Sequence, residues 1–154
     1  MDDALAYDAR RLVEFIRPLR RCIVAFSGGV DSAVVAYAAH AALGEGALAV
    51  TGVSASLASG ELQVAERIAR AIGIQHETTP TDELTDPSYL KNAPDRCFHC
   101  KTELYAKLEA EAERRGITVI LGCIKRPADR GGHSVFASLV YIDATGVIRH
   151  VHRK

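Results

Sequence analysis

Two serines, two glycines and an aspartate near the start of the chain have the types and spacing that suit phosphate chemistry. They are Ser27, Gly28, Gly29, Asp31 and Ser32, within the stretch SGGVDS. Adjacent glycines permit backbone angles forbidden to other residues and let N–H groups approach an anion without a Cβ in the way. Both serine hydroxyls can donate hydrogen bonds to phosphate oxygens. The stretch therefore predicts a phosphate-binding loop.

The aspartate in this loop indicates a metal ion as well. A carboxylate beside a phosphate repels it unless a cation such as Mg²⁺ lies between the two groups. Asp31 therefore predicts a magnesium-bound nucleotide. The stretch lacks the lysine of the pattern G-x-x-x-x-G-K-[ST], which disfavours the usual transfer of a γ-phosphoryl group, and it does not match the dinucleotide-binding fingerprint. The alternative, a glycine turn that only joins a strand to a helix, is disfavoured by its context.

A second group of reactive side chains lies in the stretch RCFHCKTEL. If a helix begins near Asp95, then Cys97, Cys100, Lys101 and Leu104 recur at spacings of three and four residues. Residues at these spacings share one face of a helix, so two thiols and an amine would point the same way. A cysteine beside a lysine has its pKa lowered toward the nucleophilic thiolate form.

Spacing alone leaves three interpretations of this group open. As a zinc site, Cys97 and Cys100 supply two of the four ligands that a structural zinc needs, Cys123 is a candidate third, and His99 projects from a different face. As a redox pair, the two cysteines fit a thioredoxin-like motif, although the stretch does not follow a strand. As core residues, they are small buried hydrophobes and Lys101 is a solvated charge.

The elements that must position these residues alternate between strand and helix. The apolar run CIVAF is typical of a strand covered on both faces, and the alanine-rich run after the glycines is typical of a helix that packs close to a sheet. Such alternation predicts an α/β fold with a doubly wound parallel sheet, in which ligands bind beyond the carboxyl ends of the strands. We expect strands at 22–26, 47–53, 74–80 and 117–121, helices at 3–17, 31–43, 60–72 (capped by Ser59, stopped by Gly73) and 95–115, and a polar loop at 81–94.

Composition and charge limit the class of protein. The 154 residues fit one ordinary domain, and 48% hydrophobic with 25% charged residues is typical of a globular chain. The formal net charge of zero argues against a nucleic-acid partner. An acidic start, with no apolar run near the roughly 20 residues of a membrane span, predicts a cytoplasmic protein without a membrane partner. Four cysteines, Cys22 among them, are too few for a disulfide scaffold, so we treat them as candidate thiols, ligands or nucleophiles.

The loop SGGVDS after a buried strand resembles the signature of the ATP pyrophosphatase, or PP-loop, superfamily. Members of that superfamily cleave ATP between the α and β phosphates, and the loop holds the pyrophosphate that leaves while a substrate oxygen is adenylated. The resemblance implies an adenine nucleotide alpha hydrolase-like, Rossmann-like fold, with ATP and Mg²⁺ as cofactors.

In combination with RCFHCKTELY, the loop is similar to the ATP-dependent sacrificial sulfur transferases of nickel-pincer cofactor biosynthesis, the LarE type, over about residues 8–121. Those enzymes adenylate a carboxylate of a pyridinium biscarboxylate mononucleotide and release pyrophosphate. They then form a thiocarboxylate with sulfur from a protein cysteine or from an iron–sulfur cluster bound by cysteines. The implied partners are ATP and a small-molecule carboxylate, and a homo-oligomer is compatible with the resemblance.

The resemblance also implies roles for individual residues. The loop serines and glycines would hold the phosphates, the aspartate would help to place Mg²⁺, and the lysine would neutralise phosphate or carboxylate charge. Two residues at the end of the second strand would border the adenosine, and the paired cysteines would handle sulfur or a cluster. In this chain these residues are Ser27, Gly28, Gly29, Asp31, Ser32, Lys101, Val53, Ser54, Cys97 and Cys100.

Other functions keep the same nucleotide site and change the acceptor. A tRNA thiolase and an amide-forming ligase of the NAD or GMP synthase type are two such enzymes, although the neutral charge counts against the thiolase. A nucleotide-binding remnant without turnover is the alternative from a different class. Exchange of pyrophosphate into ATP, with and without each acceptor, discriminates among them.

The resemblance ends at about residue 121. The family would continue with a loop of glycine, asparagine and aspartate and then a substantial C-terminal portion, whereas this chain continues GCIKRPADRGGHSVFASLVYIDATGVIRHVHRK. We therefore expect a PP-loop domain at residues 1–121 and a divergent tail at 122–154. A natural short form, a truncation or a frameshift would each explain the change, and each puts catalytic competence in question.

Within this expected tail, the stretches SVFASLVYID and TGVIRHVHRK fit a hairpin about residues 144–146 because apolar β-formers flank a turn signal. His133, His150 and His152 are candidate metal ligands. A basic, partly disordered tail is the favoured interpretation of these histidines.

Overall fold

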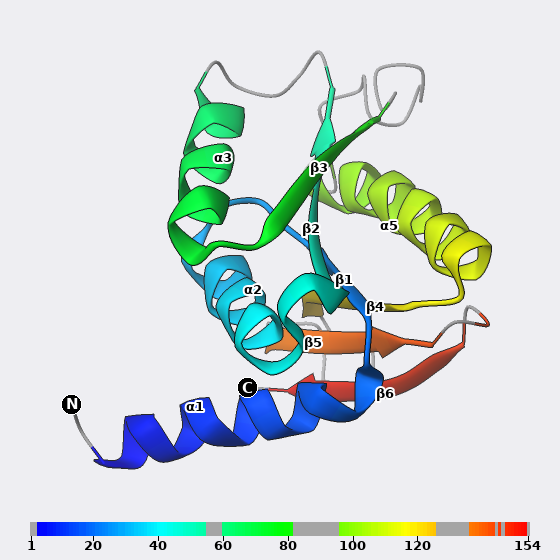
Figure 1. Cartoon of the computed structure of the whole chain (residues 1–154). Helices are drawn as coiled ribbons and strands as arrows, with labels where there is room; N and C mark the ends of the chain where they lie inside the picture. The colour runs from blue at the N-terminus through cyan, green and yellow to red at the C-terminus, as the bar shows by residue number, and fades with distance from the viewer. Residues whose placement is uncertain are drawn as a thin grey trace.

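The computed structural model describes a chain in which strands and helices alternate along most of its length (Figure 1). The described residues are 3–54, 60–81, 96–125, 136–143, 145 and 147–153. The helices are α1 (Asp3–Ile16), α2 (Val30–Leu43), α3 (Glu61–Ile72) and α5 (Arg96–Arg115), and the strands are β1 (Cys22–Ala25), β2 (Ala47–Val53), β3 (Gln75–Pro80), β4 (Thr118–Lys125), β5 (Phe136–Ile142) and β6 (Ile148–Arg153).

These strands form one six-stranded sheet in the order β3-β2-β1-β4-β5-β6. Neighbours among β3, β2, β1 and β4 pair in parallel, and Ala25 at the end of β1 lies opposite Val50 of β2. Strands β5 and β6 continue the sheet in antiparallel pairing. The predicted α/β fold with a parallel sheet is confirmed, and the antiparallel pair extends it at one edge.

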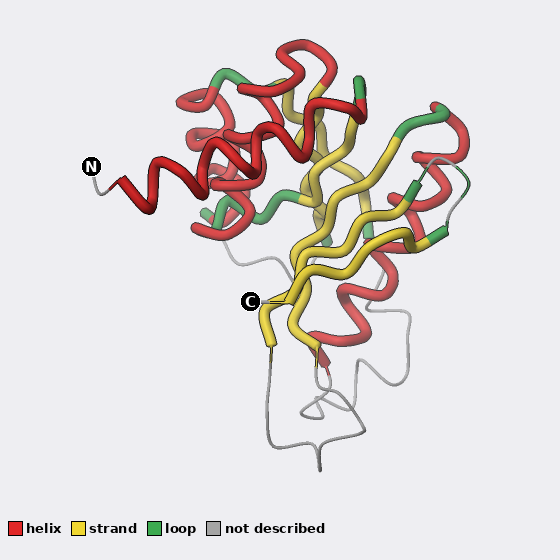
Figure 2. Tube along the Cα trace, turned by 90° about the horizontal axis from the view of Figure 1, so that it is seen from below, coloured by secondary structure: helices red, strands yellow, loops and turns green. Residues whose placement is uncertain are grey.

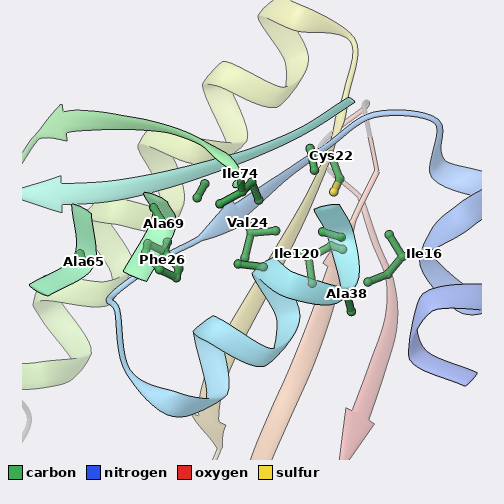
Figure 3. Close-up of a cluster of buried hydrophobic side chains, with 13 residues drawn as sticks. Ile16, Cys22, Val24, Phe26, Ala38, Ala65, Ala69, Ile74 and Ile120 are labelled. Carbon is green, nitrogen blue, oxygen red and sulfur yellow. The ribbon is translucent and has the colours of Figure 1, made fainter. Parts of the chain in front are cut away.

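Helices cover both faces of the sheet, as a doubly wound fold requires. Figures 1 and 2 show α1, α2 and α3 on one face and α5 on the other. On the first face, small side chains of α2 are buried, among them Ala36 and Ala39, and they let the helix lie close to the strands. Figure 3 shows the core between this helix layer and the sheet. On the second face, Leu108 and Ala112 of α5 are buried against the strands.

The helix ends agree with the glycines of the sequence, with one exception. Gly73 ends α3 in the left-handed region at φ 85°, where its N–H donates to the carbonyls of Ala69 and Arg70. The prediction that Ser59 caps the start of this helix is wrong. The N-cap is Gly60, with φ 100° and no side-chain hydrogen bond, and Ser59 lies outside the described residues. The positive φ explains the glycine, because a serine there would be strained.

The C-terminal residues contain strands where the favoured interpretation was a partly disordered tail. Residues 136–142 and 148–153 pair as a hairpin, and β5 is anchored along β4. Asp143 holds the turn, because its Oδ1 accepts hydrogen bonds from Thr145 N at 2.9 Å and from Val147 N at 3.1 Å. The partly disordered tail is therefore wrong for these strands and the predicted hairpin is confirmed, because β5 pairs with β4 and β6 pairs with β5. The division at residue 121 stays a prediction.

None of the described helices is both long enough and apolar enough to cross a membrane.

Candidate functional site

The predicted phosphate loop lies where β1 leaves the sheet. The ladder with β2 ends with the bond from Phe26 N to Val50 O, at 2.8 Å. Ser27 and Gly28 follow, and Gly29 is the N-cap of α2. Because β1 and β2 are parallel, the loop lies at the same edge of the sheet as Val53 and Ser54, which end and follow β2. This is the carboxyl edge, where α/β folds bind their ligands.

Hydrogen bonds within the loop join its two serines. Ser32 Oγ donates to Gly29 O at 2.9 Å, and Ser27 N donates to Ser32 Oγ at 3.3 Å. The two hydroxyl oxygens lie 3.2 Å apart, and Gly29 N donates to Ser27 Oγ at 3.3 Å. Bonds of 3.2 to 3.3 Å are at the weak end of the range, whereas bonds to an ionised phosphate are stronger. The serines can therefore exchange these partners for an anion.

The first turn of α2 adds backbone donors to the loop. The first hydrogen bond within the helix runs from Ala33 N to Gly29 O, so the N–H groups of residues 30–32 have no partner in the helix ladder. Val30 at this end is 81% exposed, which places the helix terminus at the surface. The N-terminal dipole of the helix favours an anion at this position.

The two glycines of the loop serve different purposes, in contrast to the prediction that both provide forbidden backbone angles. Gly28 has φ +74°, and a Cβ there would lie 2.8 Å from the Cα of Ala65 in α3. Gly29 has φ −74° and ψ 164°, an extended conformation that any residue adopts. Among the described residues, a Cβ at Gly29 would meet only Ser27 Oγ, at 3.3 Å. The close approach of loop and α3 thus depends on Gly28.

Asp31 lies in the first turn of α2 and is exposed. A carboxylate there stabilises the helix through the macrodipole, which is a purely structural reason for its presence. It also stands beside the N–H groups that would receive a phosphate, where a metal ion would compensate the repulsion. Among the residues whose side chains are described, no three His, Cys, Asp or Glu side chains gather as a metal site. Mg²⁺ bound by one carboxylate and substrate phosphates does not require such a cluster.

Helix α5 brings its N-terminal end to this same edge of the sheet. Three contacts define its direction, because Leu104 approaches Gly52 near the end of β2, Lys107 Nζ donates to Pro80 O at 2.5 Å, and Arg115 pairs with Glu77 at 3.2 Å. The helix therefore runs antiparallel to the parallel strands. Its first turns lie nearest the carboxyl edge, on the face opposite α2 (Figure 1).

The predicted group of two cysteines and one lysine lies in these first turns of α5. The backbone of residues 97, 100 and 101 is helical, one and two turns before Leu104 on the side of the helix that this leucine marks. The side chains of Cys97, His99, Cys100 and Lys101 lie outside the described part of the structure, as does that of Cys123 in β4. Their proposed roles stay predictions. The predicted loop at 81–94 is described only at Thr81.

One cysteine can be assigned from its environment. Cys22 in β1 is 0% exposed, and burial raises the pKa of its thiol to about 12. A thiol with this pKa stays protonated near neutral pH and is neither a nucleophile nor a ready metal ligand. Cys22 is therefore a core residue and not a candidate reactive thiol.

Cys22 should accordingly resist alkylation in the folded protein. We expect iodoacetamide at neutral pH to leave the Cys22 peptide unmodified until denaturant is added, as measured by mass spectrometry. The control is the same protein in denaturant, in which the thiol reacts. Rapid modification of Cys22 under native conditions would contradict its assignment to the core.

Sequence reasoning missed two polar residues next to the loop. Thr51 of β2 is 5% exposed, and its hydroxyl donates to Phe26 O at 2.7 Å. His76 of β3 places its Nε2 2.8 Å from Thr51 Oγ1, and its ring meets that of Phe26 edge to face. The signal that could have found them is a polar residue inside each strand, Thr51 in the apolar run ALAVTGV and His76 in IQHETTP.

The pKa of His76 predicts how stability depends on pH. Burial lowers this pKa from its ordinary value of 6.5, while Glu66 raises it and Arg70 lowers it. The unfolded chain then binds a proton more readily than the folded protein, so stability falls as pH drops below 6.5. In urea unfolding, we expect the wild type to lose stability relative to His76→Gln as pH falls through this range. Parallel curves for both proteins would contradict this.

The geometry defines the class of protein. A parallel sheet with a glycine and serine loop after β1, leading into the N-terminus of α2, is the nucleotide-binding arrangement of PP-loop folds. The family model described as "Queuosine biosynthesis protein QueC" matches residues 21–101. The chain belongs to this family of PP-loop ATP pyrophosphatases.

Two curated relatives are similar over most of this chain. An uncharacterized protein of Synechocystis sp. is 39% identical over 140 residues, which cover 83% of this chain and 52% of the relative. The "Pyridinium-3,5-bisthiocarboxylic acid mononucleotide synthase" of Lactiplantibacillus plantarum is 33% identical over 123 residues, which cover 79% of this chain and 45% of that enzyme. The chain thus spans about half the length of the curated relatives it matches.

Two solved structures share the fold. An NH3-dependent NAD synthetase from Campylobacter jejuni has a TM-score of 0.57 and 18% identity, over 72% of this chain and 53% of that one. An NMN synthetase from Francisella tularensis has a TM-score of 0.55 and 20% identity, over 72% of this chain and 51% of that one. At these identities the likeness concerns the fold alone.

Proposed function

We propose that this protein uses ATP to adenylate a carboxylate of a pyridinium mononucleotide and then replaces AMP with sulfur, in nickel-pincer cofactor biosynthesis. The observation that carries the proposal is the 33% identity, over 79% of this chain, to an enzyme whose name specifies a pyridinium bisthiocarboxylic acid mononucleotide as product. The loop at the end of β1 supports the ATP step, since its serines and helix N–H groups suit a pyrophosphate.

In the first step, a carboxylate oxygen of the substrate attacks the α-phosphorus of ATP. The bond from this phosphorus to the bridging oxygen breaks, and pyrophosphate leaves with its electron pair. Ser27, Ser32 and the N–H groups at the start of α2 would stabilise the negative charge on that leaving group. Asp31 would hold the Mg²⁺ that accompanies ATP, which would neutralise part of the phosphate charge.

In the second step, a cysteine thiolate attacks the acyl carbon, and AMP leaves with the electron pair of its bond to that carbon, which gives a thioester to the protein. Loss of the cysteine Cα hydrogen as a proton and cleavage of the Cβ–Sγ bond would then release the thiocarboxylate and leave dehydroalanine in the chain. The proposed source of the sulfur is the pair Cys97 and Cys100, as a thiolate or as ligands of an iron–sulfur cluster, with Lys101 favouring the charged form. Val53 and Ser54 would border the adenosine. Location in the cytoplasm and assembly of copies of the chain stay predictions.

The test is exchange of labelled pyrophosphate into ATP. We expect exchange that depends on Mg²⁺ and is stimulated by the pyridinium biscarboxylate mononucleotide, because adenylation is reversible until sulfur attacks. Exchange stimulated instead by a different carboxylate, with an amide formed from ammonia, would favour an amide ligase. Binding of ATP without exchange for any acceptor would favour a nucleotide-binding protein without turnover.

The cysteine pair has its own prediction. A Cys97→Ser, Cys100→Ser variant should keep substrate-stimulated pyrophosphate exchange and lose incorporation of sulfur, measured as the thiocarboxylate product by mass spectrometry. Cys22→Ala is the matched control, because Cys22 is buried and protonated and should not be needed for transfer. Sulfur transfer at the full rate by the double variant would remove both cysteines from the chemistry.

A further inference from the structure

A chain of hydrogen bonds connects the edge strand β3 to the start of the phosphate loop. Thr51 Oγ1 donates to Phe26 O at 2.7 Å and lies 2.8 Å from His76 Nε2. A threonine hydroxyl has one hydrogen, and Thr51 uses it on Phe26. The oxygen must therefore accept from His76, so Nε2 of this histidine carries a hydrogen. The hydrogen bonds therefore run from His76 Nε2 to Thr51 Oγ1 and from Thr51 Oγ1 to the carbonyl of Phe26.

This carbonyl belongs to the first peptide group of the loop. The N–H of the same peptide group is that of Ser27, which donates to Ser32 Oγ at 3.3 Å. Because the peptide group is planar, fixing the direction of its C=O also fixes the direction of its N–H. The bond from Thr51 therefore sets the orientation of a donor that lies inside the proposed phosphate site.

The side chain of Phe26 holds the same position from the core. It is 2% exposed, and its ring centroid lies 5.7 Å from that of His76 with the ring planes at 75°. Figure 3 shows Phe26 beside Ala65 and Ala69 of α3. Ala65 is also the residue that Gly28 approaches. The base of the loop is thus fixed by contacts from β2, β3 and α3.

We propose that Thr51 and His76 are positioning residues that hold the Phe26–Ser27 peptide group in the orientation needed for phosphate binding. Both residues would act through the carbonyl of Phe26 rather than by binding the phosphates themselves. The proposal rests on the proposed function to the extent that the loop binds the phosphates of ATP. It adds that the affinity of the loop is set partly by a buried hydroxyl and an imidazole in neighbouring strands.

The test compares four variants by two readouts. Thr51→Val removes the hydroxyl with little change of shape, Thr51→Ser keeps it, and His76→Leu removes the second donor. Thr118→Val is the matched control. Thr118 is also buried, but it lies at the start of β4, paired with Cys22 at the start of β1, and so at the edge of the sheet opposite the loop. The first readout is hydrogen exchange of the Ser27 amide without nucleotide, relative to that of Val24 within β1. The second is the dissociation constant for Mg-ATP and for pyrophosphate.

We expect Thr51→Val to speed exchange of the Ser27 amide relative to Val24 and to weaken binding of both ligands by about 10-fold, since a buried carbonyl and a ring N–H lose their partner. His76→Leu should have a smaller effect in the same direction. Thr51→Ser and Thr118→Val should behave like the wild type. A merely structural role would speed exchange of both amides together and would leave the affinity of the folded protein unchanged.

Two results would overturn the proposal. One is a Ser27 amide that exchanges in Thr51→Val as it does in the wild type, whether or not ATP binds. The other is faster exchange with unchanged affinity for both ligands. If the wild type itself binds neither ligand, the proposed function fails, and the exchange of Ser27 alone decides whether Thr51 and His76 position the loop.

Discussion

Replacing Gly28 with alanine is expected to lower the free energy of unfolding by about 2 to 4 kcal/mol and to abolish most nucleotide binding. Two costs add at this position. An alanine is strained at φ +74°, and its Cβ would lie 2.8 Å from Ala65 Cα and 3.1 Å from Ala65 N. Both contacts are to the backbone of α3, so rotation of a side chain cannot relieve them.

The loop is the part that should move in this variant. Helix α3 is held by Ala65 and Ala69, which are 0% and 1% exposed against the sheet, whereas Ser27 and Gly29 are exposed. Displacement of the loop would separate Ser27 from Ser32 and turn the donors away from the phosphates. We expect the dissociation constant for Mg-ATP to rise about 100-fold, which corresponds to about 2.7 kcal/mol of binding free energy.

Gly44→Ala is the matched control for Gly28→Ala. Gly44 also has a positive φ, +54°, but a Cβ there would meet no atom of the described residues within 4 Å. This variant should lose about 1 kcal/mol of stability from backbone strain and keep the parental affinity for Mg-ATP. Titration calorimetry and urea unfolding measure both quantities. Parental affinity in Gly28→Ala would show that the close contact with α3 does not shape the site.

The elements of the fold were largely predictable because local signals agreed with the tertiary structure. β1 and β2 read as apolar runs because helices cover both faces of the sheet, and Gly44 and Gly73 marked the helix ends that need a positive φ. Gly60 was missed as an N-cap because its conformation depends on how the chain enters α3. The hairpin of β5 and β6 was predictable from its turn signal, whereas the pairing of β5 with β4 has no local signal and was missed.

The position of the candidate loop was predictable, but not the contacts that shape it. Neighbouring glycines in SGGVDS look equivalent, and only the packing of α3 makes Gly28 different from Gly29. The hydrogen bonds that connect His76, Thr51 and Phe26 join strands that lie far apart in the sequence, so no local pattern indicates them. For Cys22, the type of residue suggested chemistry, whereas its burial in β1 excludes it. Contacts between residues far apart in the sequence thus determine the roles of Gly28, His76 and Cys22, which local sequence patterns do not show.

Asp31→Asn is expected to weaken binding of Mg-ATP about 30-fold to 100-fold while changing the affinity for metal-free ATP by less than about 3-fold. The substitution keeps the size of the side chain and removes its charge. With Mg²⁺ present, the variant lacks the carboxylate that would share the ion with the phosphates. Without Mg²⁺, it also lacks a charge that repels the phosphates, so the affinity should stay level or rise.

The helix dipole gives a separate effect that must be distinguished from the metal effect. A carboxylate in the first turn of α2 stabilises the helix by about 0.3 to 1 kcal/mol, so Asp31→Asn should lower the unfolding free energy without any ligand. Glu113→Gln is the control for loss of one exposed carboxylate, because Glu113 lies near the far end of α5. It should change neither affinity.

Calorimetric titrations of ATP, one with Mg²⁺ and one with a chelator, distinguish the metal effect of Asp31 from its effect on the helix dipole. Equal losses of affinity under the two conditions would mean that Asp31 acts only through the conformation of the helix terminus. A loss confined to the magnesium titration would assign Asp31 to the metal, because the helix dipole is the same in both. That second result would support a loop in which Asp31 shares Mg²⁺ with the pyrophosphate that leaves.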